Sequence, residues 1–95
     1  MNKYELTFIV RSDMEEKQIK DVANAMKKIL TDSKSKILEE KELGQKELAY
    51  PINKMNTGYY FFYVVEADAS VISEFERIAR INESILRNLT IKVED

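Results

Sequence analysis

The sequence predicts an α+β sandwich: a four-stranded antiparallel sheet with two helices on one face, in the order β-α-β-β-α-β. Three observations predict this class. A chain of 95 residues suits one domain, expected to span residues 1–95. Two segments repeat apolar residues at helical spacing, and three others alternate apolar with polar residues or are rich in β-branched and aromatic residues. Residues 36–50, whose period a charged run interrupts, are interpreted as a fourth strand. Right-handed crossovers then place both helices on the same side of the sheet, as in ferredoxin-like folds.

The first strand is expected over residues 3–11, with the first helix after it. Two sets of side chains alternate along the strand: Tyr4, Leu6, Phe8 and Val10 against Glu5, Thr7, Ile9 and Arg11. Ser12 and Asp13 each precede a glutamate by three positions, the pattern of a capping box that opens a helix. Apolar residues then recur at helical spacing from Ile19 to Leu30, which predicts an amphipathic helix of about 15–20 residues.

The second and third strands are expected to form a hairpin. Residues 36–50 indicate a long strand with an irregularity near Leu43–Gly44, because glycine permits a bulge. Pro51 limits further pairing, since it has no backbone donor, and the turn-forming residues of 53–58 predict the turn. Residues 59–65 are aromatic or β-branched, which favours a strand.

The second helix and the fourth strand complete the order. Asp68 or Ser70 is expected to cap the helix, whose apolar stripe continues to Ala79. The last strand alternates over residues 88–93. Its apolar side is expected to be the better covered one: Leu89, Ile91 and Val93.

The composition excludes several classes of active site. The chain has no Cys and no His, so it offers no thiolate or imidazole metal ligand and no nucleophilic catalysis that depends on them. Its two glycines, Gly44 and Gly58, cannot build a phosphate-binding loop or a dinucleotide fingerprint. We therefore expect no enzymatic activity, no catalytic or metal site, and no cofactor.

The charge balance limits how this chain can meet nucleic acid. The formal net charge is −2 and the pI about 5.3, whereas an independent nucleic-acid-binding domain is usually basic. Any such binding is expected to use a local patch and a partner. No segment approaches the roughly 20 apolar residues of a membrane span, and the N-terminus lacks the features of a signal or transit peptide. The cytoplasm is the expected location.

A row of apolar side chains is expected on the sheet face that carries no helix. In the third strand, Tyr60, Phe62 and Val64 share one side with Glu66, whose charge indicates that this side faces outward. Such a row favours either a docking surface or simple packing on long side chains of neighbouring strands.

Two other functions are compatible with the same fold. An RRM-like module would stack single-stranded RNA on aromatic residues of the central strands, and Gly58, Tyr59 and Phe61 match part of its signature. The expected register turns Tyr59 and Phe61 toward the helices, where bases cannot reach them. The other alternative is a ligand-binding regulator, but the first turn, Arg11–Met14, has no glycine to shape an anion-binding loop.

Several blocks of the sequence carry a family resemblance. They are Tyr4-Glu5, Gly44-Gln45-Lys46-Glu47-Leu48-Ala49-Tyr50-Pro51-Ile52-Asn53-Lys54, Gly58-Tyr59-Tyr60, Arg80-Ile81-Asn82-Glu83 and Ile85-Leu86-Arg87. In this order and spacing, the chain resembles the bacterial small-ribosomal-subunit protein S6 family over essentially its whole length. The resemblance implies a structural constituent of the small ribosomal subunit in the cytoplasm. Family members bind the central domain of small-subunit (16S) rRNA together with the small basic ribosomal protein S18, as a heterodimer.

The resemblance and the fold together suggest two sets of contact residues. The cations expected to contact RNA phosphates lie near the ends of elements: Lys3, Lys54, Arg80, Arg87 and Lys92. The alternative for each is a solvated surface charge. For the protein partner, the row Tyr60, Phe62 and Val64 is the first candidate and the edge strand near Leu43–Leu48 the second.

Within the central block, the side chains are expected to have different roles. Leu48 and Ile52 are expected in the core. Tyr50 precedes Pro51, which favours an extended backbone, and its ring is expected either in the core or at the edge with the hydroxyl outward. The block as a whole is expected either to shape the strand and hairpin or to contact RNA directly.

Overall fold

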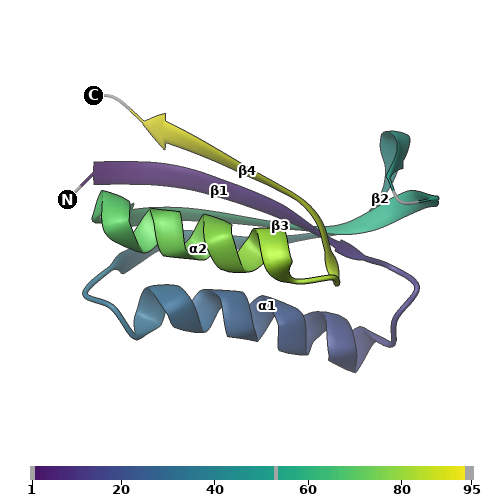
Figure 1. Ribbon diagram of the computed structural model, residues 1–95, viewed down its shortest axis with the longest axis horizontal. Coiled ribbons are helices and arrows are strands. Elements are labelled where there is room, and N and C mark those ends of the chain that lie inside the picture. Colours follow the sequence, from purple (N-terminus) through teal and green to yellow (C-terminus); the bar gives the residue numbers. More distant parts are fainter. Residues whose placement is uncertain (1, 53, 94–95) are drawn as a thin grey trace.

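The computed structural model describes residues 2–52 and 54–93 and shows the predicted order of elements. The elements are β1 (Asn2–Arg11), α1 (Glu16–Thr31), β2 (Lys36–Ile52), β3 (Met55–Ala67), α2 (Ala69–Ile81) and β4 (Ile85–Val93). The strands form one antiparallel sheet in the order β2-β3-β1-β4, and both helices lie along one side of it (Figure 1). The predicted ferredoxin-like sandwich is confirmed.

Phe8 in β1 is fully buried between the sheet and the helices. Its ring centroid lies 5.2 Å from that of Phe61 and 5.6 Å from that of Tyr63, both in β3. The ring of Phe75 in α2 is 6.0 Å away, and α1 adds the fully buried Met26 to the same core. This aromatic cluster ties the two central strands to the helical layer.

The start of α1 differs from the prediction. Glu15 takes the N-cap position, and neither Ser12 nor Asp13 caps the helix. The Ser12 hydroxyl oxygen instead lies 2.7 Å from that of Thr57, and Asp13 accepts two hydrogen bonds from the Arg11 guanidinium. These contacts occupy the side chains that the capping box would have required, so the helix begins later.

The second helix begins at a predicted residue. Asp68 takes the N-cap position of α2 in an extended backbone conformation, and its backbone carbonyl accepts the first bonds of the helix. Among the described residues, no helix is both long enough and apolar enough to cross a membrane.

The hairpin between β2 and β3 is tighter than predicted. The irregularity expected near Gly44 is confirmed, because the register with β3 shifts there and Gly44 has a φ of 85°, which favours glycine. The turn predicted over 53–58 is too long, since β3 begins at Met55 and pairs there with Ile52. Cross-strand pairing therefore overrides the turn preference of these residues. Asn53 lies outside the described residues.

The prediction of which side of β4 is covered is wrong. Thr90 pairs with Leu6 and Asn88 with Phe8, so these polar residues share the helix-covered side with the buried residues of β1. The apolar residues predicted for the covered side lie on the opposite face: Leu89, Ile91 and Val93. Consistent with this, the Asn88 Oδ1 and Thr90 Oγ1 atoms are buried without a hydrogen-bond partner.

One extra residue causes this inversion. Val10 pairs with Ile85 and Ile9 pairs with Arg87, which leaves Leu86 unpaired as a bulge. Because side chains alternate with a period of two, one inserted residue moves every later side chain to the other face. Ile85, before the bulge, is buried in the core as a normal alternation requires.

Candidate functional site on the open face of the sheet

The face of the sheet without helices, termed the open face, is the candidate site. Residues of β1, β3 and β4 that pair across the strands build its apolar floor: Thr7, Ile9, Tyr60, Phe62, Val64, Leu89 and Ile91. The neighbouring positions on β2 carry mostly charged side chains, such as Lys41 opposite Phe62 and Glu39 opposite Val64. An apolar floor beside a charged margin is the composition of a docking surface.

The predicted row on β3 does face this side, with unequal exposure. Tyr60 and Phe62 are half-buried, whereas Val64 is only 8% exposed and offers little area for contact. On β4, Leu89 and Ile91 are 55% and 49% exposed and extend the apolar floor beyond the predicted row. Sequence reasoning missed this extension because nothing in the local alternation marks the bulge that turns β4 over.

Two adjoining hollows lie on the open face. One, of about 230 Å³, is lined by Thr7 and Leu89, and the other, of about 90 Å³, lies beneath the end of β2. Ile9, Tyr60 and Arg87 line both. The open face is therefore concave near its middle, with an apolar floor and an arginine at the rim.

The central block of the sequence forms a wall of this concavity. Leu48 and Ile52, expected in the core, are instead half-buried and line the smaller hollow. Tyr50 is 56% exposed at the edge, which decides between the two positions expected for its ring. Its hydroxyl does not point freely into solvent, because Arg87 donates a hydrogen bond to it.

Gly58 allows the block and the sheet to pack closely. A methyl group added at its Cα would lie 2.3 Å from Ile9 Cγ2 and 3.5 Å from Leu48 Cδ2. Ile9 is β-branched and stiff about χ1, so it cannot move its methyl group away cheaply. The glycine is required at this position for its small size, since only contact distance restricts it.

We expect Gly58→Ala to lower the free energy of unfolding by about 1–3 kcal/mol, the usual range for overpacking. Urea denaturation followed by circular dichroism measures it. In an Ile9→Ala background, where the clashing methyl group is absent, the same substitution should cost much less. Equal costs in the two backgrounds would show that Ile9 is not the obstacle.

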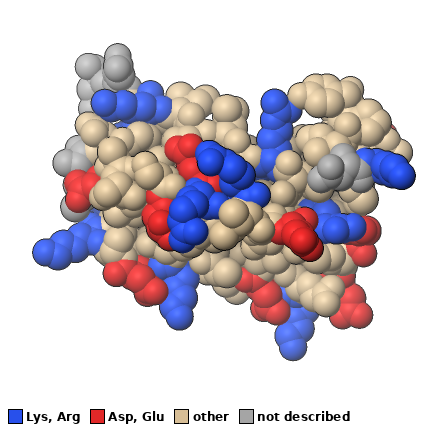
Figure 2. All heavy atoms as spheres, viewed as in Figure 1, with Lys and Arg blue, Asp and Glu red and all other residues tan. Residues whose placement is uncertain are grey.

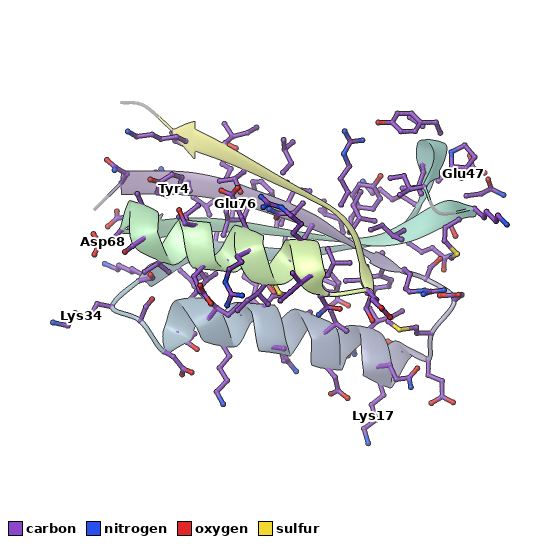
Figure 3. All side chains as sticks on the ribbon, in the orientation of Figure 1. Tyr4, Lys17, Lys34, Glu47, Asp68 and Glu76 are labelled. Atoms are coloured by element: carbon purple, nitrogen blue, oxygen red, sulfur yellow. The ribbon has the colours of Figure 1, made fainter. Side chains whose placement is uncertain are left out.

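The five predicted RNA-contacting cations do not form one cluster. Arg87 lies at the concavity of the open face, and Arg80 ends α2 just before the short turn to β4. Lys54 lies in the hairpin turn at the same end of the molecule. Lys3 and Lys92 lie at the other end, about 20 Å away along the strands, and Lys92 points to the helix-covered side. Figure 3 shows this separation: Tyr4, next to Lys3, is far from Glu47 on the hairpin.

These five cations share one electrostatic property. Within residues 2–52 and 54–93, none of them forms an ion pair. Two other arginines do: Arg11 binds Asp13 and Arg77 binds Glu74, and these hydrogen bonds hold the pKa of each carboxyl group below its usual value. Lys and Arg alternate with Asp and Glu over the face seen in Figure 2, so the molecule has no broad basic surface there.

The aromatic positions expected for an RRM-like site are not available to bases. Phe61 is 4% exposed and stacks on Phe8 on the helix-covered side of the sheet. The hydroxyl of Tyr59 donates a hydrogen bond of 2.6 Å to the Glu42 carboxylate, which raises the pKa of Tyr59 to about 12. In the part of the chain that the structure describes, no group of three acidic side chains could hold a metal ion. The burial of Phe61 argues against the RRM-like arrangement, in which this position stacks on a base.

Comparison with known proteins shows the same similarity over the whole chain. A family model described as Ribosomal protein S6 matches residues 3–92. The small ribosomal subunit protein bS6 of Phytoplasma australiense is 37% identical over 92 residues, which cover 97% of this chain and 99% of that protein. Both matches include the blocks around the open face.

Solved structures agree in fold. The crystal structure of 30S ribosomal protein S6 from Thermotoga maritima has a TM-score of 0.91 and 28% sequence identity, covering 97% of this chain and 87% of that one. An uncharacterized protein of Thermotoga maritima has a TM-score of 0.64 at 20% identity, covering 98% of both chains. The second similarity concerns the fold alone.

Proposed function

The chain belongs to the ribosomal protein S6 family, and from that premise we propose that it binds the central domain of small-subunit (16S) rRNA as a heterodimer with ribosomal protein S18. The observation that supports this proposal most directly is the open face. It combines an apolar floor, suited to a protein partner, with Arg87 at its rim, suited to a phosphate. The role we propose is structural, without catalysis, a cofactor or a small-molecule substrate, and its place is the ribosome in the cytoplasm.

The distribution of charge supports a shared RNA interface. The chain has a net charge of −2, and the five candidate cations lie at two separate ends of the sheet. Phosphate neutralisation supplies much of the affinity for RNA, so this chain alone should bind weakly. A basic partner would add the missing charge, while this chain contributes shape and a few contacts from Lys3, Lys54, Arg80, Arg87 and Lys92.

The partner surface that we propose is the row Tyr60, Phe62 and Val64, extended by Leu89 and Ile91. Aromatic and aliphatic side chains that are desolvated at the centre of an interface dominate its affinity. The second candidate, the edge of β2 near Leu43–Leu48, is less suited, since its charged side chains oppose strand addition.

Sedimentation tests the class of function. A tagged copy of the chain, expressed in a bacterium, is expected to sediment with the small ribosomal subunit on a sucrose gradient. The subunit fraction is then washed at high salt. A ribosomal constituent should stay bound, whereas a loosely bound contaminant should be removed. A chain that stays at the top of the gradient would contradict a ribosomal role.

RNA binding tests the shared interface. On filters, a transcript of the central rRNA domain is expected to bind the chain weakly alone and about 10- to 100-fold more tightly once purified S18 is added. This range corresponds to a common coupling free energy between two ligands. Equally tight binding with and without S18 would contradict the heterodimer proposal.

A further inference from the structure

Tyr50 and Arg87 meet across the open face although they lie 37 residues apart in the sequence. Arg87 Nη1 donates a hydrogen bond to the Tyr50 hydroxyl oxygen. The centre of the guanidinium also lies 5.7 Å from the centre of the Tyr50 ring, within cation–π range. Two kinds of contact therefore hold one exposed arginine.

The backbone of β2 brings Tyr50 to this position. β2 pairs with β3 up to Glu47, with earlier register shifts before Glu39 and Gly44. Pairing then stops and resumes only at Ile52, so the residues between Glu47 and Ile52 leave the ladder. In Figure 1 this end of β2 curls away from its long straight part. The freed segment lies against Ile9 and Arg87, with which it lines the smaller hollow.

Core packing does not explain why an aromatic ring stands at position 50. The ring is 56% exposed, so its burial contributes little to stability. Its neighbour Pro51 limits the backbone, which keeps the segment extended. The ring instead contacts Arg87, whose side chain would otherwise sample many rotamers.

We propose that Tyr50 is a positioning residue for RNA binding: it holds the Arg87 guanidinium at the rim of the open face, oriented to receive an RNA phosphate. The inference rests on the proposed function and assigns the central block a task in it. The guanidinium uses one nitrogen on Tyr50 and keeps its other donors available for the phosphate. Holding the side chain before binding removes part of the entropy that binding would otherwise lose.

Lys46 makes a similar contact with a tyrosine ring, but without a hydrogen bond among the described contacts. Its amino group lies 5.9 Å from the centre of the Tyr60 ring. Two tyrosine rings at the open face are thus each in contact with a cation: Tyr60 with Lys46 of β2, and Tyr50 with Arg87 of β4. A lysine is also a point charge, so the Tyr50–Arg87 pair carries the inference.

A double-mutant cycle on RNA binding tests the proposal. Affinity for the central-domain transcript is measured with S18 present, at several salt concentrations, for the parent chain, Tyr50→Leu, Arg87→Ala and the double variant. Tyr50→Leu is expected to weaken binding roughly 3- to 30-fold, and Tyr50→Phe, which keeps the ring, less. In the Arg87→Ala background, Tyr50→Leu should have no further effect. Arg87→Ala should lower the salt slope by about 1.

Two controls separate positioning from folding. Tyr50→Leu should leave the thermal unfolding midpoint nearly unchanged, because the ring is largely exposed. Arg77→Ala removes an arginine that is paired with Glu74 on α2 and should leave RNA affinity unchanged. In the free protein, NMR relaxation should show an ordered Arg87 side chain that becomes mobile in Tyr50→Leu.

The outcomes distinguish this inference from the proposed function. If Tyr50→Leu weakens binding equally with and without Arg87, the tyrosine acts on RNA or on the hairpin itself and the inference fails. It also fails if Arg87→Ala weakens binding while Tyr50→Leu does not, or if neither does. In all three cases the proposed function stands as long as the parent chain binds RNA with S18; loss of that binding overturns the function itself.

Discussion

Replacing Phe8 with alanine is expected to lower the free energy of unfolding by about 3–5 kcal/mol, more than the Gly58→Ala substitution should cost. Phe8 is fully buried and contacts three other aromatic rings, from β3 and α2, at centroid distances of 5.2–6.0 Å. The substitution removes both the transfer free energy of the ring and its packing contacts. It also leaves a cavity between two layers that cannot close without moving a helix.

Urea denaturation measures this effect, with the denaturant slope showing whether the transition remains two-state. The free energy of unfolding of a small domain is only about 5–15 kcal/mol, so a loss of this size is enough to leave the alanine variant unfolded. Phe8→Leu therefore belongs in the same series, with an expected loss above that of an exposed aromatic substitution such as Tyr50→Leu. If Phe8→Leu and Tyr50→Leu cost the same, Phe8 is not at the centre of the core.

Phe62→Glu is expected to weaken binding to S18 by about 2 kcal/mol or more, which is roughly 30-fold in the dissociation constant. Phe62 lies near the middle of the proposed partner surface, between Thr7 of β1 and Lys41 of β2. A carboxylate placed there would lose its hydration when the partner covers it, and the neighbouring Lys41 is already paired with Glu39. Isothermal titration calorimetry with purified S18 measures the change.

Ile81→Glu is the matched control. Ile81 is an apolar residue that is 65% exposed at the end of α2, on the helical layer and away from the open face. The same charge introduced there should leave S18 binding within about twofold of the parent chain, because a charge outside the interface loses no hydration on binding. Circular dichroism should show both variants folded, since neither residue belongs to the core. Equal weakening by both variants, or none by Phe62→Glu, would exclude the open face as the partner surface.

The architecture followed from local patterns. The alternation of residues 3–11 predicted β1 nearly to its ends, and the apolar stripe from Ile19 to Leu30 predicted α1. Asp68 marked the start of α2, and Gly44 marked a bulge in β2. These signals are readable because each depends on residues a few positions apart: a helical period, a strand period, or one backbone conformation.

The candidate site was only partly predictable. The row Tyr60, Phe62 and Val64 was placed on the correct face, because Glu66 marks that side of β3. The five candidate RNA-contacting cations were selected by their position near the ends of elements. The structure adds that, among the described residues, none of them forms an ion pair. Their division between two ends of the sheet depends on strand order, which no local pattern reports.

By itself, the sequence determined the order of elements and the helix-facing side of β1 and β3, because both follow from the spacing of apolar residues. It also identified the family, through the resemblance of whole blocks of sequence. Only the tertiary structure decided that Leu89 and Ile91 face outward and that Tyr50 holds Arg87. Both depend on how one strand pairs with another that is distant in the sequence. The extra residue at Leu86 places the later side chains of β4 on the opposite face of the sheet. The break in pairing after Glu47 lets the end of β2 leave the ladder and brings Tyr50 to Arg87.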